Sequence, residues 1–234
     1  MPKDLTKKQL VTLSFLGATL FVSLVAIQSS YKTRIRSHAQ TLRQVAAREA
    51  ILGTSSTAVT LYYDLLDGWN LVAFPVANES LNTASDIMRE FAEQGAYVTT
   101  VSAWDGDKWI EFSMRGDQTY GFDFELTTHA AYFVRNHIPT IIAISGRVVP
   151  LELEDLDLKP GWNAVSLPEG LPNALAVLDE LNVQDESIEA REINRFNSGA
   201  WQPFIKQEIA PGDVREYGDN FAIDRRLGYF VEFK

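Results

Sequence analysis

The chain has 234 residues and a net charge of −10, with 46% hydrophobic and 22% charged residues. This composition is typical of a folded protein, and the absence of cysteine excludes disulfides, thiol catalysis and cysteine-ligated metal centres. Residues 1–50 carry eight basic and two acidic side chains, which leaves −16 on the remainder. An acidic body disfavours nucleic acid as a partner, because phosphate binding needs a basic face.

A run of 18 uncharged residues extends from Leu10 to Ile27. As a helix it would be about 27 Å long, close to the thickness of a bilayer's hydrocarbon core. The run predicts a membrane contact through residues 10–27 and a transmembrane helix over 10–28, after a short tail at 1–9. No small-residue cleavage pattern follows, so an uncleaved signal anchor is favoured over a signal peptide or a buried core helix.

Basic residues on both sides of this run leave its orientation open, and their count slightly opposes an exported C-terminus. The short N-terminal tail and the long C-terminal part favour a single-pass cell-membrane protein with an extracytoplasmic C-terminal region. Residues 31–51 contain neither glycine nor proline. We therefore expect a juxtamembrane helical stalk over residues 29–53, a segment through which the chain could form oligomers.

The sequence GWNLVAFP at 68–75 recurs as GWNAVSLP at 161–168. Each copy continues with an apolar helix pattern, two strands joined by a turn, and a closing strand. The fold class expected is α+β: two homologous β-rich modules, 58–139 and 140–234, each with one helix on a mostly antiparallel sheet or small barrel. The motif residues with an expected structural role are Gly68, Trp69, Asn70, Pro75, Tyr132, Gly161, Trp162, Asn163, Pro168 and Tyr229.

This order of features resembles the tandem GWN(x)V-type repeat module of bacterial and archaeal cell-surface proteins. The resemblance covers residues 58–234, and the second copy carries the closing Gly-Tyr-Phe-Val of residues 228–231. The first copy departs from the pattern, since Ala131 stands where the second copy has Gly228. The resemblance implies a non-catalytic part used for display or adhesion, and it implies no particular ligand.

Catalytic and metal-binding patterns are absent from the sequence. His38, His129 and His137 lack the spacing of a zinc site, and no nucleophile or phosphate-binding motif occurs. The acids that a polysaccharide hydrolase or a weak calcium site would use are either Asp105, Asp107 and Glu111 or the run Glu152, Glu154, Asp155 and Asp157. The second group alternates with leucines, which accounts for it as an acidic solvent face. Asp105 precedes Gly106 in a hairpin turn, which accounts for it without either function. No enzyme activity, cofactor or metal is therefore expected.

The tryptophans are the other candidate ligand contacts. Trp69 matches Trp162 in the repeat, and Trp109 matches Trp201, which favours packing within the module. The candidate ligand contacts lie in and next to the hairpin turn: Trp104, Asp105, Asp107 and Trp109.

The function expected from these features is that of a membrane-anchored envelope protein. Its tandem module would serve adhesion, scaffolding or the binding of another envelope component, with a protein or a polysaccharide as partner. One alternative is a subunit of a membrane complex assembled through the N-terminal helix. Another is a cell-wall or polysaccharide hydrolase.

Overall fold

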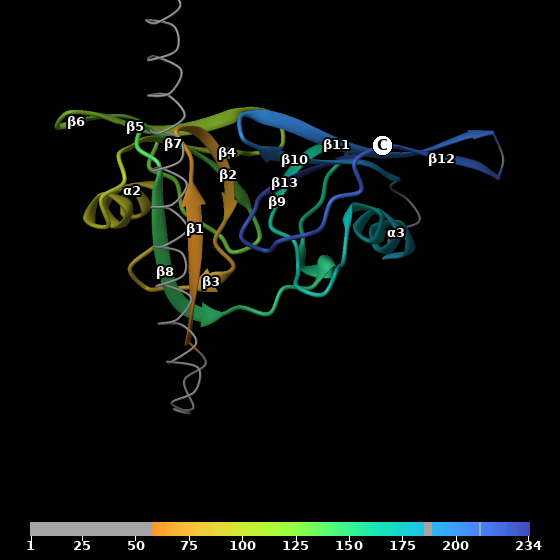
Figure 1. The fold of residues 1–234 in the computed structure, drawn as a ribbon, viewed down its shortest axis with the longest axis horizontal. Coiled ribbons are helices and arrows are strands. Elements are labelled where there is room, and N and C mark those ends of the chain that lie inside the picture. The colour runs from red at the N-terminus through yellow and green to blue at the C-terminus, as the bar shows by residue number, and fades with distance from the viewer. Residues whose placement is uncertain (1–57, 185–188, 211) are drawn as a thin grey trace, which may run out of the picture. The chain divides into compact units, whose positions relative to one another are not determined.

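The computed structural model describes residues 58–184, 189–210 and 212–234. In these residues the chain forms three antiparallel sheets and two α-helices (Figure 1). The described residues all belong to one compact unit.

The first copy of the repeat forms a five-stranded sheet, here called the first sheet. Its strand order is β2-β7-β4-β5-β6. The strands are β2 (Gly68–Ala73), β4 (Val98–Trp104), β5 (Trp109–Arg115), β6 (Gln118–Gly121) and β7 (Ala131–Asn136). The GWN segment lies at one edge of this sheet, paired with the closing strand β7.

The second copy forms an equivalent sheet, here called the second sheet, with the order β9-β13-β10-β11-β12. The strands are β9 (Gly161–Val165), β10 (Ala190–Asn197), β11 (Ala200–Ala210), β12 (Asp213–Gly218) and β13 (Tyr229–Phe233). Strand order and register match the first sheet: Trp69 lies opposite Arg135, and Trp162 lies opposite Glu232. The sequence repeat is therefore also a structural repeat.

A third sheet packs against the first copy. Its order is β1-β8-β3, with strands β1 (Ala58–Leu65), β3 (Val76–Ala77) and β8 (Thr140–Val148). Residues 140–148, assigned to the second module from the sequence, pair along the whole of β1 (Figure 1). The second copy instead begins with a single 3-10 turn, η1 (Leu153–Asp155).

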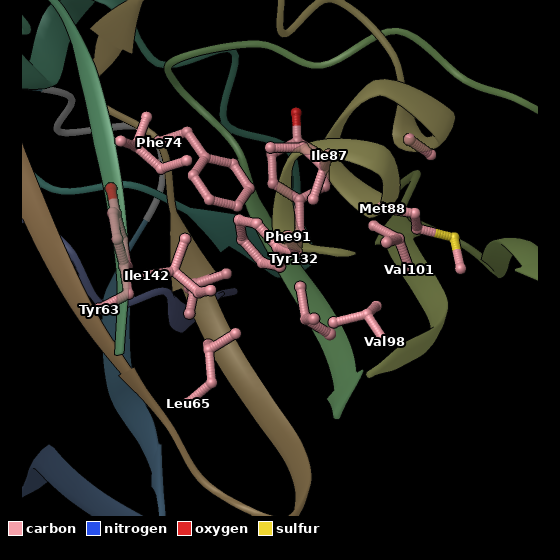
Figure 2. Packing of buried hydrophobic residues seen from close by; sticks show 14 of the residues in the cluster. Tyr63, Leu65, Phe74, Ile87, Met88, Phe91, Val98, Val101, Tyr132 and Ile142 are labelled. Carbon is pink, nitrogen blue, oxygen red and sulfur yellow. The ribbon is translucent and has the colours of Figure 1, made fainter. Parts of the chain in front are cut away.

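One helix packs against one face of each five-stranded sheet. In α2 (Ala84–Glu93), Thr83 and Asp86 form a reciprocal capping box that satisfies the first free backbone N–H groups. The apolar side of α2 packs with the third sheet and the first sheet into one core, in which Phe91 and Ile142 are fully buried (Figure 2). Burying a side chain such as Phe91 stabilises the fold by about 2–3 kcal/mol.

The second copy has a core of its own around α3 (Ala174–Gln184). Asn173 accepts a hydrogen bond from the N–H of Ala176 at 3.0 Å, and so caps this helix. Val177, Leu178 and Leu181 provide its buried stripe. The two helices thus support equivalent sheets through separate cores.

The GWN motif acts at the start of each edge strand. Gly68 and Gly161 have φ values of 98° and 92°, which disfavour a residue with a Cβ atom. The Asn70 side chain then closes the turn, because its Oδ1 accepts from Leu66 N at 2.8 Å and its Nδ2 donates to Leu66 O at 3.0 Å. Asn163 makes the same pair of bonds with Lys159, at 3.0 and 2.7 Å.

The expectation of a membrane anchor requires correction. Residues 1–57, with the predicted transmembrane helix at 10–28 and stalk at 29–53, lie outside the described residues. Within the described ranges no helix is long and apolar enough to cross a membrane. Their helices have 10 and 11 residues, whereas a span needs about 20. The α+β class with a transmembrane helix is thus replaced by a β-rich fold of three antiparallel sheets, and the single-pass cell-membrane localisation has no support.

Candidate functional site: an aromatic interface between the two copies

Each five-stranded sheet has one face covered by its own helix. The opposite faces of the first and second sheets, here called the outer faces, pack against each other. Because side chains alternate across a strand, Val72 faces the core of the first copy while Leu71 faces the second copy. Leu71, Ala131 and Phe230 are buried in this contact. Trp104, Phe133, Trp162, Ala164 and Phe196 are partly buried against them. We call this contact the aromatic interface.

The aromatic interface has approximate two-fold symmetry. Its centre is the pair of repeat-equivalent residues Phe133 and Phe230, whose ring centroids lie 6.5 Å apart. Each also contacts rings of the other copy: Phe133 lies 5.8 Å from Trp201, and Phe230 lies 5.7 Å from Trp109.

The backbone follows the same symmetry. Ala73 N donates to Arg226 O at 3.0 Å, and the equivalent Ser166 N donates to His129 O at 2.9 Å. Equivalent surfaces therefore meet in the way that they do in a symmetric protein pair.

Two equivalent clefts flank the central phenylalanines. Cleft A has a volume of about 500 Å³ and is lined by Trp104, Trp109, Trp162, Glu192, Asn194, Trp201, Pro203 and Phe230. Cleft B has a volume of about 330 Å³ and is lined by Trp69, Ser102, Trp109, Glu111, Phe133, Phe196 and Trp201. Trp109 and Trp201 border both clefts and are 42% and 46% exposed.

Polar side chains differ between the two clefts. In cleft A, Asn194 Nδ2 donates to Glu192 Oε1 at 2.8 Å. In cleft B, Ser102 Oγ lies 3.4 Å from Glu111 Oε1, and the Arg135 guanidinium lies over the Trp69 ring, 5.7 Å from its centroid. Both clefts thus combine wide aromatic walls with a few polar groups, as ligand-binding sites do.

The structure brings together only part of the predicted contact set. Trp104 lies in the aromatic interface, where its indole Nε1 donates to Trp162 O at 2.8 Å, and Trp109 borders both clefts. Asp105 instead closes the hairpin turn, since its Oδ1 accepts from Lys108 N at 2.8 Å and Asp107 N at 3.0 Å. These backbone hydrogen bonds hold the pKa of the Asp105 carboxyl below its ordinary value.

In the described ranges, no three histidine, aspartate or glutamate side chains are arranged so that they could hold a metal ion. Asp107 is exposed within the hairpin turn, whereas Glu111 borders cleft B. His129 and Asp105 both line a separate hollow of about 310 Å³ with Asp155 and Asp157. His137 bonds to Thr99 at 2.9 Å, and His38 lies outside the described residues.

The sequence did not identify Glu192 or the central phenylalanines as part of a site. The equivalence of Trp109 and Trp201 was visible there, but it was interpreted as packing inside each module. The repeat does not reveal that the two outer faces meet, which is what makes these residues neighbours.

No protein-family model, curated protein or solved structure matches this chain. The proposal for its function therefore rests on the geometry of the aromatic interface and its clefts.

Proposed function

We propose that this protein is a non-catalytic binding protein whose two module copies present one shared aromatic groove, formed by clefts A and B, to a partner protein. The role would be adhesion, scaffolding or the recruitment of that partner. The resemblance of the tandem module to repeat modules of cell-surface proteins supports a non-catalytic role.

The observation that carries the proposal is the exposure of three tryptophans along the groove. Trp69, Trp109 and Trp201 are 36%, 42% and 46% exposed, although buried rings of the same interface lie next to them. A folding core alone gives no reason to leave such large rings in water. Contiguous exposed apolar surface is typical of interaction sites, and tryptophan is enriched among the residues that dominate binding energy.

The polar groups of the groove suit recognition. Glu111, Glu192 and Asn194 stand at the edges of an otherwise aromatic surface. Such an arrangement gives apolar contact area at the centre and orientation at the rim, as in protein–protein interfaces.

The experiment is to apply the full-length protein to an array of defined peptides and oligosaccharides. A double variant, Trp109→Ala with Trp201→Ala, should lose the signals that the wild type gives. The matched control is Tyr120→Ala with Tyr217→Ala, because these residues are 50% and 45% exposed on β6 and β12 and do not line either cleft. Signals that persist in the tryptophan variant, or that come from oligosaccharides alone, would contradict the proposal.

A further inference from the structure

The two clefts differ in charge at equivalent positions. In the first copy, Trp69 on β2 lies opposite Arg135 on β7, and the guanidinium covers the indole ring. In the second copy, Trp162 on β9 lies opposite Glu232 on β13. The position that holds a cation beside cleft B therefore holds a carboxylate beside cleft A.

The next strand strengthens this difference. Arg135 lies opposite Thr100 on β4, whereas Glu232 lies opposite Glu192 on β10. Two like charges directly opposite each other destabilise a sheet. In the described part of the chain, no basic side chain forms an ion pair with Glu192 or Glu232.

Cleft A places Glu192 beside aromatic walls, and Glu232 lies opposite Glu192 on the neighbouring strand. Trp104, Trp109, Trp162 and Trp201 line cleft A together with Glu192. Aromatic faces attract cations through their quadrupoles. A guanidinium stacks on indole rings and bonds to carboxylates with a fixed planar geometry, so it fits this combination better than an ammonium does.

The charge of the sequence after residue 50 acts in the same direction, since it is −16. Such a field speeds the approach of a basic partner.

We infer that cleft A binds an arginine side chain of the partner protein. The guanidinium would stack within the four tryptophans of cleft A and pair with Glu192 and Glu232, as Arg135 stacks on Trp69 within the chain. The inference rests on the proposed function, because it names the group that the groove recognises.

The test uses an N-acetylated, C-amidated peptide, Gly-Arg-Gly-Arg-Gly, titrated into the full-length protein with tryptophan fluorescence or calorimetry as readout. Peptides with lysine or with citrulline, the neutral isostere of arginine, are the comparison probes. Citrulline should bind at least about tenfold more weakly than arginine, since it loses both the charge pairing and the cation–π attraction. The affinity of the lysine peptide should lie between those of the arginine and citrulline peptides.

The decisive variant is Glu192→Gln with Glu232→Gln, which keeps the shape of cleft A. This double variant should bind the arginine peptide at least about tenfold more weakly than the wild type does. Its control is Glu93→Gln with Glu216→Gln, which makes the same change in net charge at exposed positions outside the clefts. The control variant should bind within about twofold of the wild type, because distant exposed charges are screened by salt.

The outcomes separate the two proposals. Equal binding of arginine and citrulline, or binding unaffected by Glu192→Gln with Glu232→Gln, would overturn the arginine site. Failure of the arginine peptide to bind, while array ligands still depend on Trp109 and Trp201, would overturn the arginine site and leave the proposed function standing. Array signals that survive loss of both tryptophans would overturn the proposed function itself.

Discussion

Ala131 and Gly228 are repeat-equivalent, and the Cβ of Ala131 fills the space that a Cβ on Gly228 would need. The two atoms would lie 2.5 Å apart, and Leu71 Cγ would lie 2.8 Å from the added Cβ. Real non-bonded carbons do not approach so closely, so this part of the aromatic interface has room for one methyl group and not for two.

A first prediction concerns exchange of these two residues. Gly228→Ala should lower the free energy of unfolding by about 1–3 kcal/mol because it overpacks the contact between the copies. Ala131→Gly should cost about 1 kcal/mol through chain entropy and lost packing. The double exchange should be more stable than Gly228→Ala alone, because it again leaves one methyl group. Urea unfolding measures all three variants, and simply additive effects would contradict the steric explanation.

A second prediction concerns the centre of the interface. Phe230 is 7% exposed and contacts rings of both copies. Phe230→Ala should lower the free energy of unfolding by about 3–5 kcal/mol, as truncation of buried aromatic residues does. The comparison is Tyr97→Ala, because the Tyr97 ring is 56% exposed. This substitution should change the free energy of unfolding by less than about 1 kcal/mol. Similar effects of both substitutions in urea unfolding would show that the interface contributes little.

A third prediction is alkaline destabilisation through buried tyrosine. Burial raises the pKa of Tyr229 from 10.0 to about 12, although its hydroxyl also accepts a hydrogen bond from Asp224 N at 2.8 Å. Because the folded pKa is the higher one, this contribution to stability is complete below pH 10.0 and is lost towards pH 12. Tyr229→Phe should be less stable than wild type at neutral pH by about 1 kcal/mol.

The stability difference between wild type and Tyr229→Phe should shrink above pH 10.0. Urea unfolding at a series of pH values measures it. A difference that stays constant up to pH 12 would show that Tyr229 titrates alike in the folded and unfolded chains.

A fourth prediction concerns the link between the second copy and β1. Arg226 Nε donates to Asp224 Oδ1 at 2.9 Å, and its Nη1 donates to Tyr62 O at 2.8 Å. Burial alone would raise the pKa of the Asp224 carboxyl, but the hydrogen bonds from Arg226 outweigh it and lower that pKa below 3.8. This stabilisation is therefore present above pH 3.8 and is lost as the pH falls through the folded pKa.

Asp224→Asn should destabilise the protein at neutral pH by about 1 kcal/mol, a modest figure because the pair is partly exposed to solvent. The gap to wild type should close in acid. Thermal unfolding from pH 7 downwards checks this, and a gap that widens on acidification would contradict the assigned ion pair.

The local features of the fold follow from the sequence better than its long-range pairings. The GWN turn, the capped helix α2 and the Asp105-Gly106 hairpin depend on neighbouring residues, so their patterns carry the information. The partner of β8 does not follow from residues 140–148 themselves, because β1 lies about 80 residues earlier and many apolar strands would suit it equally.

The site was less predictable for the same reason. Trp104 and Trp109 were identified from the hairpin, but their neighbours Trp201 and Phe230 come from the other copy. Ala131 was interpreted as a departure from the repeat pattern, whereas the structure shows that its methyl group occupies space shared with Gly228. Neither the aromatic neighbours from the other copy nor the space shared by Ala131 and Gly228 can be recognised from the sequence of a single copy.

Joining both copies in one chain also has an evolutionary consequence. In a homodimer, each substitution would appear on both sides of the axis, so Gly228 and Ala131, or Glu232 and Arg135, would have to be identical. A duplicated module within one polypeptide escapes this constraint. One side can hold an arginine where the other holds an acid, so that the two ends of a symmetric architecture differ in charge.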